Sequence, residues 1–348
     1  MKTILFDNII YSLQQIGGIS SMWAMLQEIV MRESSISPIF IERNDALNNV
    51  YRKSIDIPNN KLIKSRIQIP IILDRYLSID TSTIMPMVVH SSYYRCVKNK
   101  NVKKIVTVHD FTYERYLSGL QRYVHCKQKY RAINDADIVV CVSQNTYNDL
   151  FKYMPYIDQN KIQVIYNGVS DDFCKLDDVQ RGDRLLYVGS RAKYKNFDLL
   201  IEALSETTHH LDICGAPLSI KEQGYLNKKL GRNRYKIYST VDNNTLNILY
   251  NKAKCLIYPS SYEGFGMPIV EAQRSGCPVI AMNVSSIPEI IGETPLLIHN
   301  IDKRNLLIKL KLLDTPTLID EVKISGLENS YRFRSYKMVN DYMELYQN

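Results

Sequence analysis

Paired cysteines, glycine, proline and long apolar runs are scarce in this chain, and each scarcity excludes a class of protein. The seven cysteines are scattered and form no C-x-x-C pair, which argues against a disulfide framework and a zinc site and favours a reducing cytoplasm. Fourteen glycines and twelve prolines leave no room for a long disordered region. No run of about 20 apolar residues occurs, so no segment is expected to span a membrane. The opening MKTILFDNII carries an early Asp7 and predicts a strand rather than a signal peptide.

The overall composition is that of a globular enzyme with two domains. Hydrophobic residues make up 45% and charged residues 23% of 348 residues, about twice the length of a typical domain. The net charge of +8 indicates an anionic partner. Nucleic acid, the phosphates of a nucleotide sugar and an anionic membrane surface all fit this charge. Because no nucleic-acid-binding motif accompanies it, we expect no nucleic-acid partner.

Short apolar runs rich in Ile, Val and Tyr alternate with helical patterns along the chain. Strands are expected at Thr3–Phe6, Ile39–Ile41, Val88–His90, Lys104–His109, Ile138–Ser143, Ile162–Tyr166, Arg184–Val188, His210–Ile213, Lys236–Tyr238, Cys255–Tyr258 and Pro278–Ala281. Helices are expected at Ser20–Glu33, Asp198–Leu204, Thr245–Ala253 and Pro268–Arg274. Strands that alternate with helices in this way form parallel sheets covered on both faces. The predicted fold class is therefore α/β.

The alternation is interrupted once, by the polar and turn-rich stretch GVSDDFCKLDDVQRG at Gly168–Gly182. Such a stretch is typical of a linker between domains. We therefore expect a first domain over residues 1–170, a linker over 171–183 and a second domain over 184–330. Residues 331–348 are expected to form a final helix.

The clearest sign of chemistry is YPSSYEGFGMPIVEAQRSGCPVIA, from Tyr258 to Ala281. The expected strand ends in a loop where Gly264 and Gly266 let the backbone approach a ligand closely. A helix is expected to start near Pro268. Free N–H groups at a helix start beyond a strand end are typical of a phosphate site.

Two carboxylates and two cations accompany this loop. Glu263 in the loop could accept hydrogen bonds from sugar hydroxyls, and Glu271 in the helix could bind a ribose diol; alternatively, both are solvated surface groups. Arg191 and Lys195 follow the predicted strand RLLYVGS. They could neutralise a diphosphate or could be solvated loop cations.

The pair Glu263-x7-Glu271 within EGFG-x-P resembles the signature of family-4 retaining glycosyltransferases. The resemblance covers almost the whole chain. Gly17-Gly18-Ile19 resembles the glycine loop after their first strand, and His109-Asp110 resembles their donor-site histidine. The segments SQNTYNDL, VIYNGV and YVGSRAKYKNFDLLIEAL match the end of their first domain and the start of their second.

This resemblance implies the GT-B fold, with two Rossmann-like parallel-sheet domains facing a cleft and a last helix that crosses back to the first domain. The acceptor would bind the first domain and the nucleotide sugar the second. The implied reaction is a retaining transfer to a saccharide acceptor, with no metal and no cofactor. The implied catalytic residues are His109, Glu263, Lys195 and Arg191. The implied donor-binding residues are Gly17, Gly18, Ser190, Arg191, Lys195, Glu263, Gly264, Phe265, Gly266, Met267, Pro268 and Glu271.

The chain departs from many relatives directly after the strand RLLYVGS. Those relatives have Arg immediately after the glycine, whereas this chain has Ser190 there and Arg191 one residue later. The departure leaves Lys195 as the firmer of the two phosphate assignments. Glycines 17 and 18 could also be only a turn, and His109 could be a hydrogen-bonded structural histidine.

Asp135-Ala136-Asp137 matches the D-x-D that metal-dependent glycosyltransferases use, but it precedes the apolar run IVVCVS and is expected to be structural. Two other functions fit the same fold. A sugar-nucleotide epimerase would act on the donor without an acceptor, and a non-catalytic binding subunit would lack part of the donor set.

The setting that the resemblance implies is bacterial surface-polysaccharide synthesis in the cytoplasm. The acceptor would be a lipid-linked O-antigen or capsule intermediate, and a mannose-type hexose is the first guess for the transferred sugar. The segment KLIKSRIQIPIILDRY (Lys61–Tyr76) sets Lys61, Lys64, Arg66 and Arg75 among Ile and Leu. It could rest on anionic lipid at the inner face of the cell membrane. Alternatively, Ile67, Ile69 and Ile71 form an ordinary buried strand.

Overall fold

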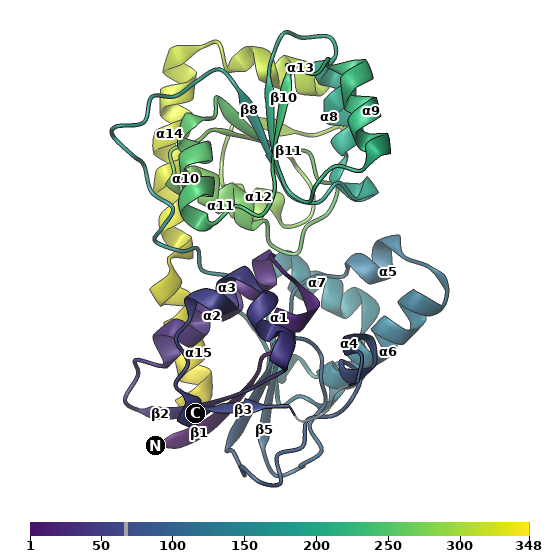
Figure 1. Ribbon diagram of the computed structural model, residues 1–348, viewed down its shortest axis with the longest axis vertical. Helices are drawn as coiled ribbons and strands as arrows, with labels where there is room; N and C mark the ends of the chain where they lie inside the picture. Colours follow the sequence, from purple (N-terminus) through teal and green to yellow (C-terminus); the bar gives the residue numbers. More distant parts are fainter. Residues whose placement is uncertain (66–68, 348) are drawn as a thin grey trace. The chain divides into compact units, whose positions relative to one another are not determined.

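The computed structural model describes residues 1–65 and 69–347 (Figure 1). The chain divides into two compact units, one formed by Met1–Gly168 with Ser335–Asn348 and the other by Val169–Arg334. The stretch expected as a linker lies within the second unit. Arg181 of this stretch bonds to the second unit: its guanidinium donates to the carbonyls of Ala253 (2.5 Å) and Gly276 (2.7 Å).

The first unit contains a seven-stranded sheet in which every neighbouring pair is parallel. Its strands are β1 Lys2–Asp7, β2 Ile36–Glu42, β3 Leu62–Lys64, β4 Val88–Ser91, β5 Lys103–Val108, β6 Ile138–Cys141 and β7 Ile162–Val164, in the order β3-β2-β1-β4-β5-β6-β7. The short β3 pairs with β2 and was not expected from the sequence. The central strands are buried on both faces, as parallel strands under two helical layers must be.

Helices cover both faces of this sheet (Figure 1). They are α1 Ile10–Leu13, α2 Gly18–Val30, α3 Val50–Ser54, α4 Ile71–Asp74, α5 Thr112–Tyr116, α6 Gly119–Asp135, α7 Gln144–Tyr153 and α15 Ser335–Gln347. Because strand order reverses between β1 and β4, right-handed crossovers put α2 on one face and α6 on the other.

The last helix, α15, packs on α2 and β1 and completes the core of the first unit. The Tyr346 hydroxyl lies 2.7 Å from His90 Nδ1, and the Thr107 hydroxyl lies 3.0 Å from His90 Nε2. Burial lowers the pKa of His90 to about 3, so the imidazole is neutral. His90, which also ends an apolar run in the sequence, is therefore a core residue.

The second unit contains a six-stranded parallel sheet in the order β10-β9-β8-β11-β12-β13. Its strands are β8 Leu185–Val188, β9 Leu211–Cys214, β10 Tyr235–Tyr238, β11 Cys255–Tyr258, β12 Val279–Met282 and β13 Leu297–Ile298. Its helices are α8 Phe197–Leu204, α9 Ile220–Lys229, α10 Asn243–Lys252, α11 Met267–Arg274, α12 Ile287–Ile291, α13 Lys303–Leu312 and α14 Pro316–Ser330. In Figure 1, α8, α9 and α13 lie on one side of this sheet and α10, α11 and α14 on the other.

Strand order in the second sheet reverses between β8 and β11. The loops that leave these two strands therefore turn to opposite faces of the sheet. In open α/β sheets, ligands bind at such a switch point. The fold thus brings together the β8–α8 and β11–α11 loops, which hold the cations and carboxylates singled out in the sequence.

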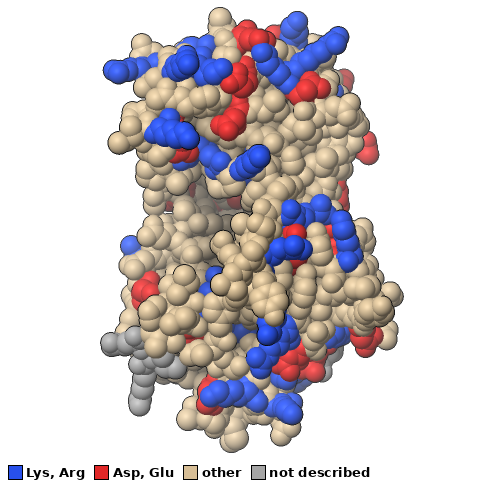
Figure 2. All heavy atoms as spheres, turned by 90° about the vertical axis from the view of Figure 1, so that its right-hand side faces the viewer, with Lys and Arg blue, Asp and Glu red and all other residues tan. Residues whose placement is uncertain are grey.

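Charged side chains are mixed on the surface. On the face drawn in Figure 2, Lys and Arg occur over both units and are interspersed with Asp and Glu. Within the part of the chain that the structure describes, no helix has the length and apolar character needed to cross a membrane.

Candidate active site

Lys195 and Glu263 meet at the switch point of the second sheet. Lys195 ends the short 3-10 helix Lys193–Lys195 after β8, and Glu263 lies in the loop after β11. The Lys195 ammonium donates to Glu263 Oε1, and the two side chains are only 13% and 12% exposed. Such a pair is costly to separate unless new polar partners replace the lost ones. A ligand with both anionic and hydroxyl groups would supply them.

Gly266 carries the chain from this loop into α11. It is the N-cap of the helix and has φ 109°, a conformation that favours glycine. A glycine N-cap has no side chain to accept from the first N–H groups of the helix, and Pro268 follows within the first turn. Pro268 has no N–H and the Ile269 N–H donates to the Gly266 carbonyl (3.0 Å), so the positive end of the helix dipole is the main feature here that suits an anion. Phe265 is buried with its ring centroid 5.5 Å from that of Phe333, which anchors the loop.

Glu271 lies in α11, one turn beyond its start, and is 8% exposed. The hydroxyl of the fully buried Tyr250, on α10, donates to Glu271 Oε2 at 2.9 Å. Burial raises the pKa of Glu271 to about 7, although the Tyr250 hydrogen bond partly opposes the shift. The Tyr250 hydroxyl offsets only part of the cost of burying this carboxylate, so the carboxylate can accept further hydrogen bonds from a diol.

Arg191 has a different environment from Lys195. Its guanidinium donates to Glu222 Oε1 (2.6 Å) and to the carbonyls of Ala216 and Pro217 (both 2.9 Å), which ties the β8–α8 loop to the start of α9. The pKa of Glu222 falls to about 2, through hydrogen bonds from Arg191 and Ser219. Contact between Arg191 and a phosphate stays a prediction, and it would require these bonds to be exchanged. Ser190 contributes its carbonyl, which accepts from the Tyr187 hydroxyl at 2.5 Å.

The remaining predicted residues belong to the first unit. His109 follows β5, is 7% exposed, and its ring bonds to the Ser92 backbone. Its Nε2 has no hydrogen-bond partner among the described residues. Burial lowers the pKa of His109 to about 4, so the ring is neutral and the buried Nε2 is left for a ligand.

Gly17 is the N-cap of α2, and Gly18 is its first residue. A Cβ at Gly17 would lie 2.5 Å from the Gln14 side-chain oxygen, so the Gln14 amide would have to move to admit a side chain there. The N-terminus of α2 therefore starts without a capping side chain, like that of α11.

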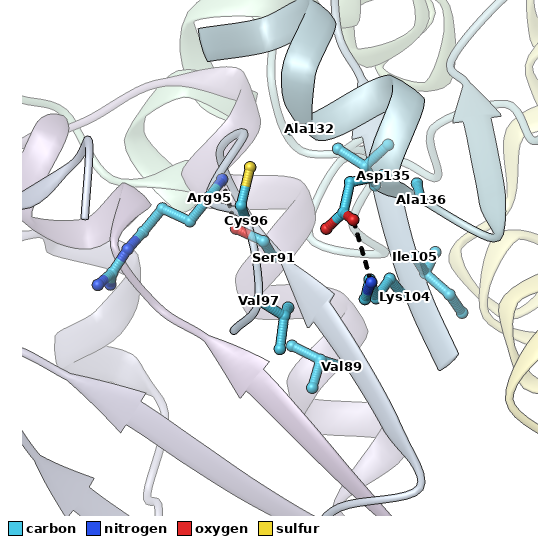
Figure 3. Close-up of a pocket in the computed structure, with 11 residues that line it drawn as sticks. Val89, Ser91, Arg95, Cys96, Val97, Lys104, Ile105, Ala132, Asp135 and Ala136 are labelled. Carbon is cyan, nitrogen blue, oxygen red and sulfur yellow. Dashed lines mark hydrogen bonds and ion pairs between the residues drawn. The ribbon is translucent and has the colours of Figure 1, made fainter. Parts of the chain in front are cut away.

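The D-x-D sequence of the first unit is engaged within the protein. Asp135 forms an ion pair with Lys104 (3.1 Å), and Asp137 Oδ2 accepts from the Lys104 backbone N–H (2.7 Å). The described residues contain no group of three or more His, Cys, Asp or Glu able to hold a metal ion. Figure 3 shows Asp135 and Lys104 beside a small pocket between β4, β5 and α6. Its volume of about 10 Å³ suits roughly one water molecule and excludes a sugar.

Four residues that support this site were missed in the sequence: Tyr250, Asn196, Ser285 and Ser286. Tyr250 lies in an ordinary helical pattern. The side chains of Asn196 and Ser285 bond to the Glu263 loop from left-handed backbone conformations, which sequence patterns do not reveal. The position of Asn196 directly after Lys195 was the only available signal.

Two family models match consecutive parts of the chain. Residues 45–173 match Glycosyltransferase Family 4, and residues 172–313 match Glycosyl transferases group 1. Together the two models cover residues 45–313, so most of the chain matches glycosyltransferases. It is therefore a glycosyltransferase, and the family resemblance seen in the sequence is confirmed.

Curated relatives place it among proteins of bacterial surface polysaccharides. It is 29% identical to an uncharacterized 41.2 kDa protein in the cps region of Klebsiella pneumoniae, over 73% of each chain. It is 28% identical to the O-antigen chain mannosyltransferase RfbU of Salmonella typhimurium, over 58% of each chain.

Solved structures share the fold. Sucrose-phosphate synthase from Thermosynechococcus elongatus superposes with a TM-score of 0.81 and 17% identity, over 100% of this chain and 98% of that one. HepE of Anabaena, in complex with UDP-glucose, superposes with a TM-score of 0.74 and 16% identity, over 99% of both chains. The expected fold of two parallel-sheet α/β domains, GT-B, is confirmed.

Proposed function

We propose that this glycosyltransferase moves a hexose from a nucleotide-diphosphate sugar to a saccharide acceptor, with retention of anomeric configuration and without a metal ion. The observation that carries the proposal is the buried Lys195–Glu263 pair beside the glycine-capped start of α11, with Glu271 on the same helix. A cation, a positive helix end and two carboxylates together suit a diphosphate, a sugar and a ribose.

In this mechanism, catalysis comes from positioning and electrostatics. Glu271 accepts from the ribose hydroxyls, while Lys195 and the α11 N–H groups bind the diphosphate. Glu263 and the backbone of Gly264–Gly266 orient the sugar. When the bond from sugar to phosphate breaks, negative charge grows on the leaving oxygen, where Lys195 and the helix start are already placed. The acceptor hydroxyl attacks from the same face, and the leaving phosphate takes its proton.

The first unit supplies the other half of the proposed machinery. Gly17 and Gly18 contact the donor phosphate through the backbone, and His109 contacts the donor sugar as a neutral ring. The orphaned Nε2 of His109 supports this role, because a buried nitrogen without a partner is costly unless a ligand pairs with it. The acceptor that we propose for this unit is a lipid-linked saccharide.

The named relatives support a substrate class. RfbU is an O-antigen chain mannosyltransferase, and WbdA of Escherichia coli is a serotype-specific mannosyltransferase that is 25% identical over 70% of this chain. HepE and the pneumococcal O-GlcNAc transferase GtfA were solved with UDP. A mannose-type sugar is therefore our first candidate, and an O-antigen or capsule intermediate is the proposed acceptor.

A thermal-shift panel of GDP-mannose, UDP-glucose and UDP-N-acetylglucosamine tests the donor. A true donor at 100 times its dissociation constant adds about 2.7 kcal/mol to the free energy of unfolding. We expect one of the three to raise the melting temperature more than its own nucleoside diphosphate does. If neither the three nucleotide sugars nor their free nucleoside diphosphates raise the melting temperature, the proposed nucleotide-sugar site is contradicted.

Acceptor dependence separates transfer from the two rival functions. The donor that shifts the melting temperature is incubated with and without a saccharide acceptor, and release of nucleoside diphosphate is measured. Transfer requires the acceptor. An epimerase would convert the sugar without one, and a binding subunit would bind the donor and release nothing. The anomeric configuration of the product, read by NMR, tests retention.

A further inference from the structure

Two residues in left-handed conformation hold the loop that carries Glu263. Among the described residues, five that are not glycine have positive φ: Met85, Tyr94, Asn196, Thr240 and Ser285. Asn196 (φ 52°) and Ser285 (φ 58°) both bond to the segment between β11 and α11. Left-handed backbone costs free energy for most residues other than glycine, less for asparagine than for serine, and such strain gathers where function needs a fixed geometry.

Ser285 brackets the backbone of Glu263 with one hydroxyl. Its Oγ accepts from the Glu263 N–H (3.2 Å) and donates to the Glu263 carbonyl (2.6 Å). The neighbouring Ser286 hydroxyl donates to the Phe265 carbonyl at 2.9 Å. The loop between β12 and α12 therefore fixes the residue whose carboxylate pairs with Lys195.

Asn196 joins the same segment to the loop that carries Lys195. Its side-chain amide donates to the Pro259 carbonyl (2.8 Å) and to Ser261 Oγ (2.7 Å). The Ser261 N–H in turn donates to the Tyr194 carbonyl at 2.8 Å. The residue after Lys195 is thus bonded to the strand end that leads to Glu263.

We propose that Ser285 and Asn196 are positioning residues that set Glu263 beside Lys195 for sugar transfer. The inference rests on the proposed function, because it assigns the positioned pair to the donor. Neither residue is given a contact with substrate. The Ser285 hydroxyl acts on the backbone of Glu263 itself. The Asn196 amide acts on Pro259 and Ser261, which precede Glu263.

Glycine at these positions separates positioning from stability. Ser285→Gly and Asn196→Gly relieve the left-handed strain but remove the hydroxyl or the amide, whereas Ser285→Ala removes the hydroxyl and keeps the strain. We expect kcat to fall at least tenfold in all three, with Ser285→Gly melting at or above the temperature of Ser285→Ala. Affinity for the nucleoside diphosphate should change less than threefold, because Glu271 and α11 are untouched. A purely structural role would make kcat follow the melting temperature.

Thr240→Gly is the matched control, since Thr240 has φ 56° in the same unit and forms no recorded bond with the Glu263 loop. Hydrogen exchange gives a readout that needs no activity. We expect the amides of residues 260–266 to exchange at least tenfold faster in Ser285→Gly and Asn196→Gly, and to be unchanged in Thr240→Gly. Unchanged exchange in Ser285→Gly and Asn196→Gly, or a kcat equal to wild type in these variants, would overturn the positioning role. A wild-type protein that transfers no sugar would instead count against the proposed function.

Discussion

At the scale of single residues, the central feature is the charge pair of Lys195 and Glu263, nearly buried at the switch point. Within the proposed mechanism, Glu263 has a function beyond neutralising Lys195. Glu263→Ala should lower turnover at least 100-fold while the fold survives, because a positioned polar group in a preorganised site contributes roughly 3 kcal/mol to transition-state stability. Steady-state kinetics and thermal unfolding measure the two effects.

Glu202→Ala is the control for this change, because Glu202 pairs with Lys229 at the surface of the same unit (2.7 Å) and lies outside the proposed site. Its turnover should match wild type. Near-wild-type turnover in Glu263→Ala would show that Glu263 has no catalytic role.

Glu271 makes nucleotide binding dependent on pH. The ribose hydroxyls donate, so the ionised carboxylate is the binding form, and with a pKa of about 7 it rises from about one tenth of the protein at pH 6 to nine tenths at pH 8. The apparent affinity for nucleoside diphosphate should therefore rise about ninefold across this range. Calorimetric titration of wild type and Glu271→Gln checks this. The difference between them isolates Glu271 from the titration of the nucleotide itself, and identical pH profiles would exclude the ribose role.

The same shift affects stability with a defined sign. Because the raised pKa means that the folded protein holds this proton more tightly than the unfolded chain, the stabilisation is complete below the unfolded pKa of 4.5. It is lost as pH rises to about 7. The cost of ionising the buried Glu271 above that pH is roughly 3 kcal/mol, and hydrogen bonds from a ribose would offset part of this cost.

Residue types and spacing singled out the charged groups near the switch point, but not the partners that each of them has in the fold. Lys195 and Glu263 were singled out from separate segments, and the fold brings them into contact because β8 and β11 are neighbours. Arg191 was assigned to phosphate by the same reasoning, yet its guanidinium bonds to Glu222 and two carbonyls. A sequence shows that a cation follows a strand, but not which acceptors the next helix will offer it.

At the scale of elements, the start of α11 depends on one glycine. A Cβ on Gly266 would lie 3.2 Å from Ile269 Cδ1, in a conformation that side chains disfavour. Gly266→Ala should lower the free energy of unfolding by about 1–2 kcal/mol and weaken nucleoside diphosphate binding, because the first N–H groups of the helix would be displaced. Gly224→Ala on α9, where a Cβ would meet nothing within 4 Å, is the control. If Gly266→Ala and Gly224→Ala change nucleoside diphosphate binding equally, Gly266 has no specific role in phosphate binding.

The helix start and Lys195 also bear on metal dependence. Together they supply positive charge at the proposed diphosphate position, so we expect transfer to persist in EDTA. Turnover is measured in chelator, and then with Mg²⁺ or Mn²⁺ restored. Complete loss with EDTA, reversed by either ion, would return attention to Asp135 and Asp137 as a metal site.

Most elements were predictable, and the misses have physical causes. The expected strands of both sheets lie within a few residues of the observed ones, because buried parallel strands are plain runs of Ile, Val and Tyr. The bounds of the 17-residue α6 were not predicted, since its buried positions include His125 and Lys129, which interrupt the apolar period. Lys129 is buried against Glu114 at 3.0 Å, a pairing that only the tertiary fold reveals. Ile71 begins the helix α4 rather than ending a strand, and Ile67 lies outside the described residues.

At the scale of the whole molecule, several cations in and near the segment proposed to meet lipid form local contacts within the protein. Lys98 pairs with Asp80 (3.2 Å), Lys103 donates to the Leu345 carbonyl (3.1 Å), and Arg75 lies against His125. The most distinctive surface feature of the segment Lys61–Tyr76 is therefore its exposed apolar side chains. Ile72 and Leu73 on α4 are 68% and 57% exposed, with Lys61 and Lys64 earlier in the same segment.

These exposed residues sharpen the membrane hypothesis into a test. We expect vesicles containing an anionic lipid to retain the protein at low salt, with neutral vesicles and high salt releasing it, because each Lys or Arg near an anionic surface contributes about 1 kcal/mol. The double change Ile72→Ser and Leu73→Ser should reduce co-sedimentation, as should Lys61→Gln with Lys64→Gln. Ile324→Ser, which removes an equally exposed apolar side chain from the second unit, should have no effect. Equal and negligible retention on both kinds of vesicle at low salt would refute membrane contact through this segment. The lipid-linked acceptor would then have to reach the enzyme through its saccharide alone.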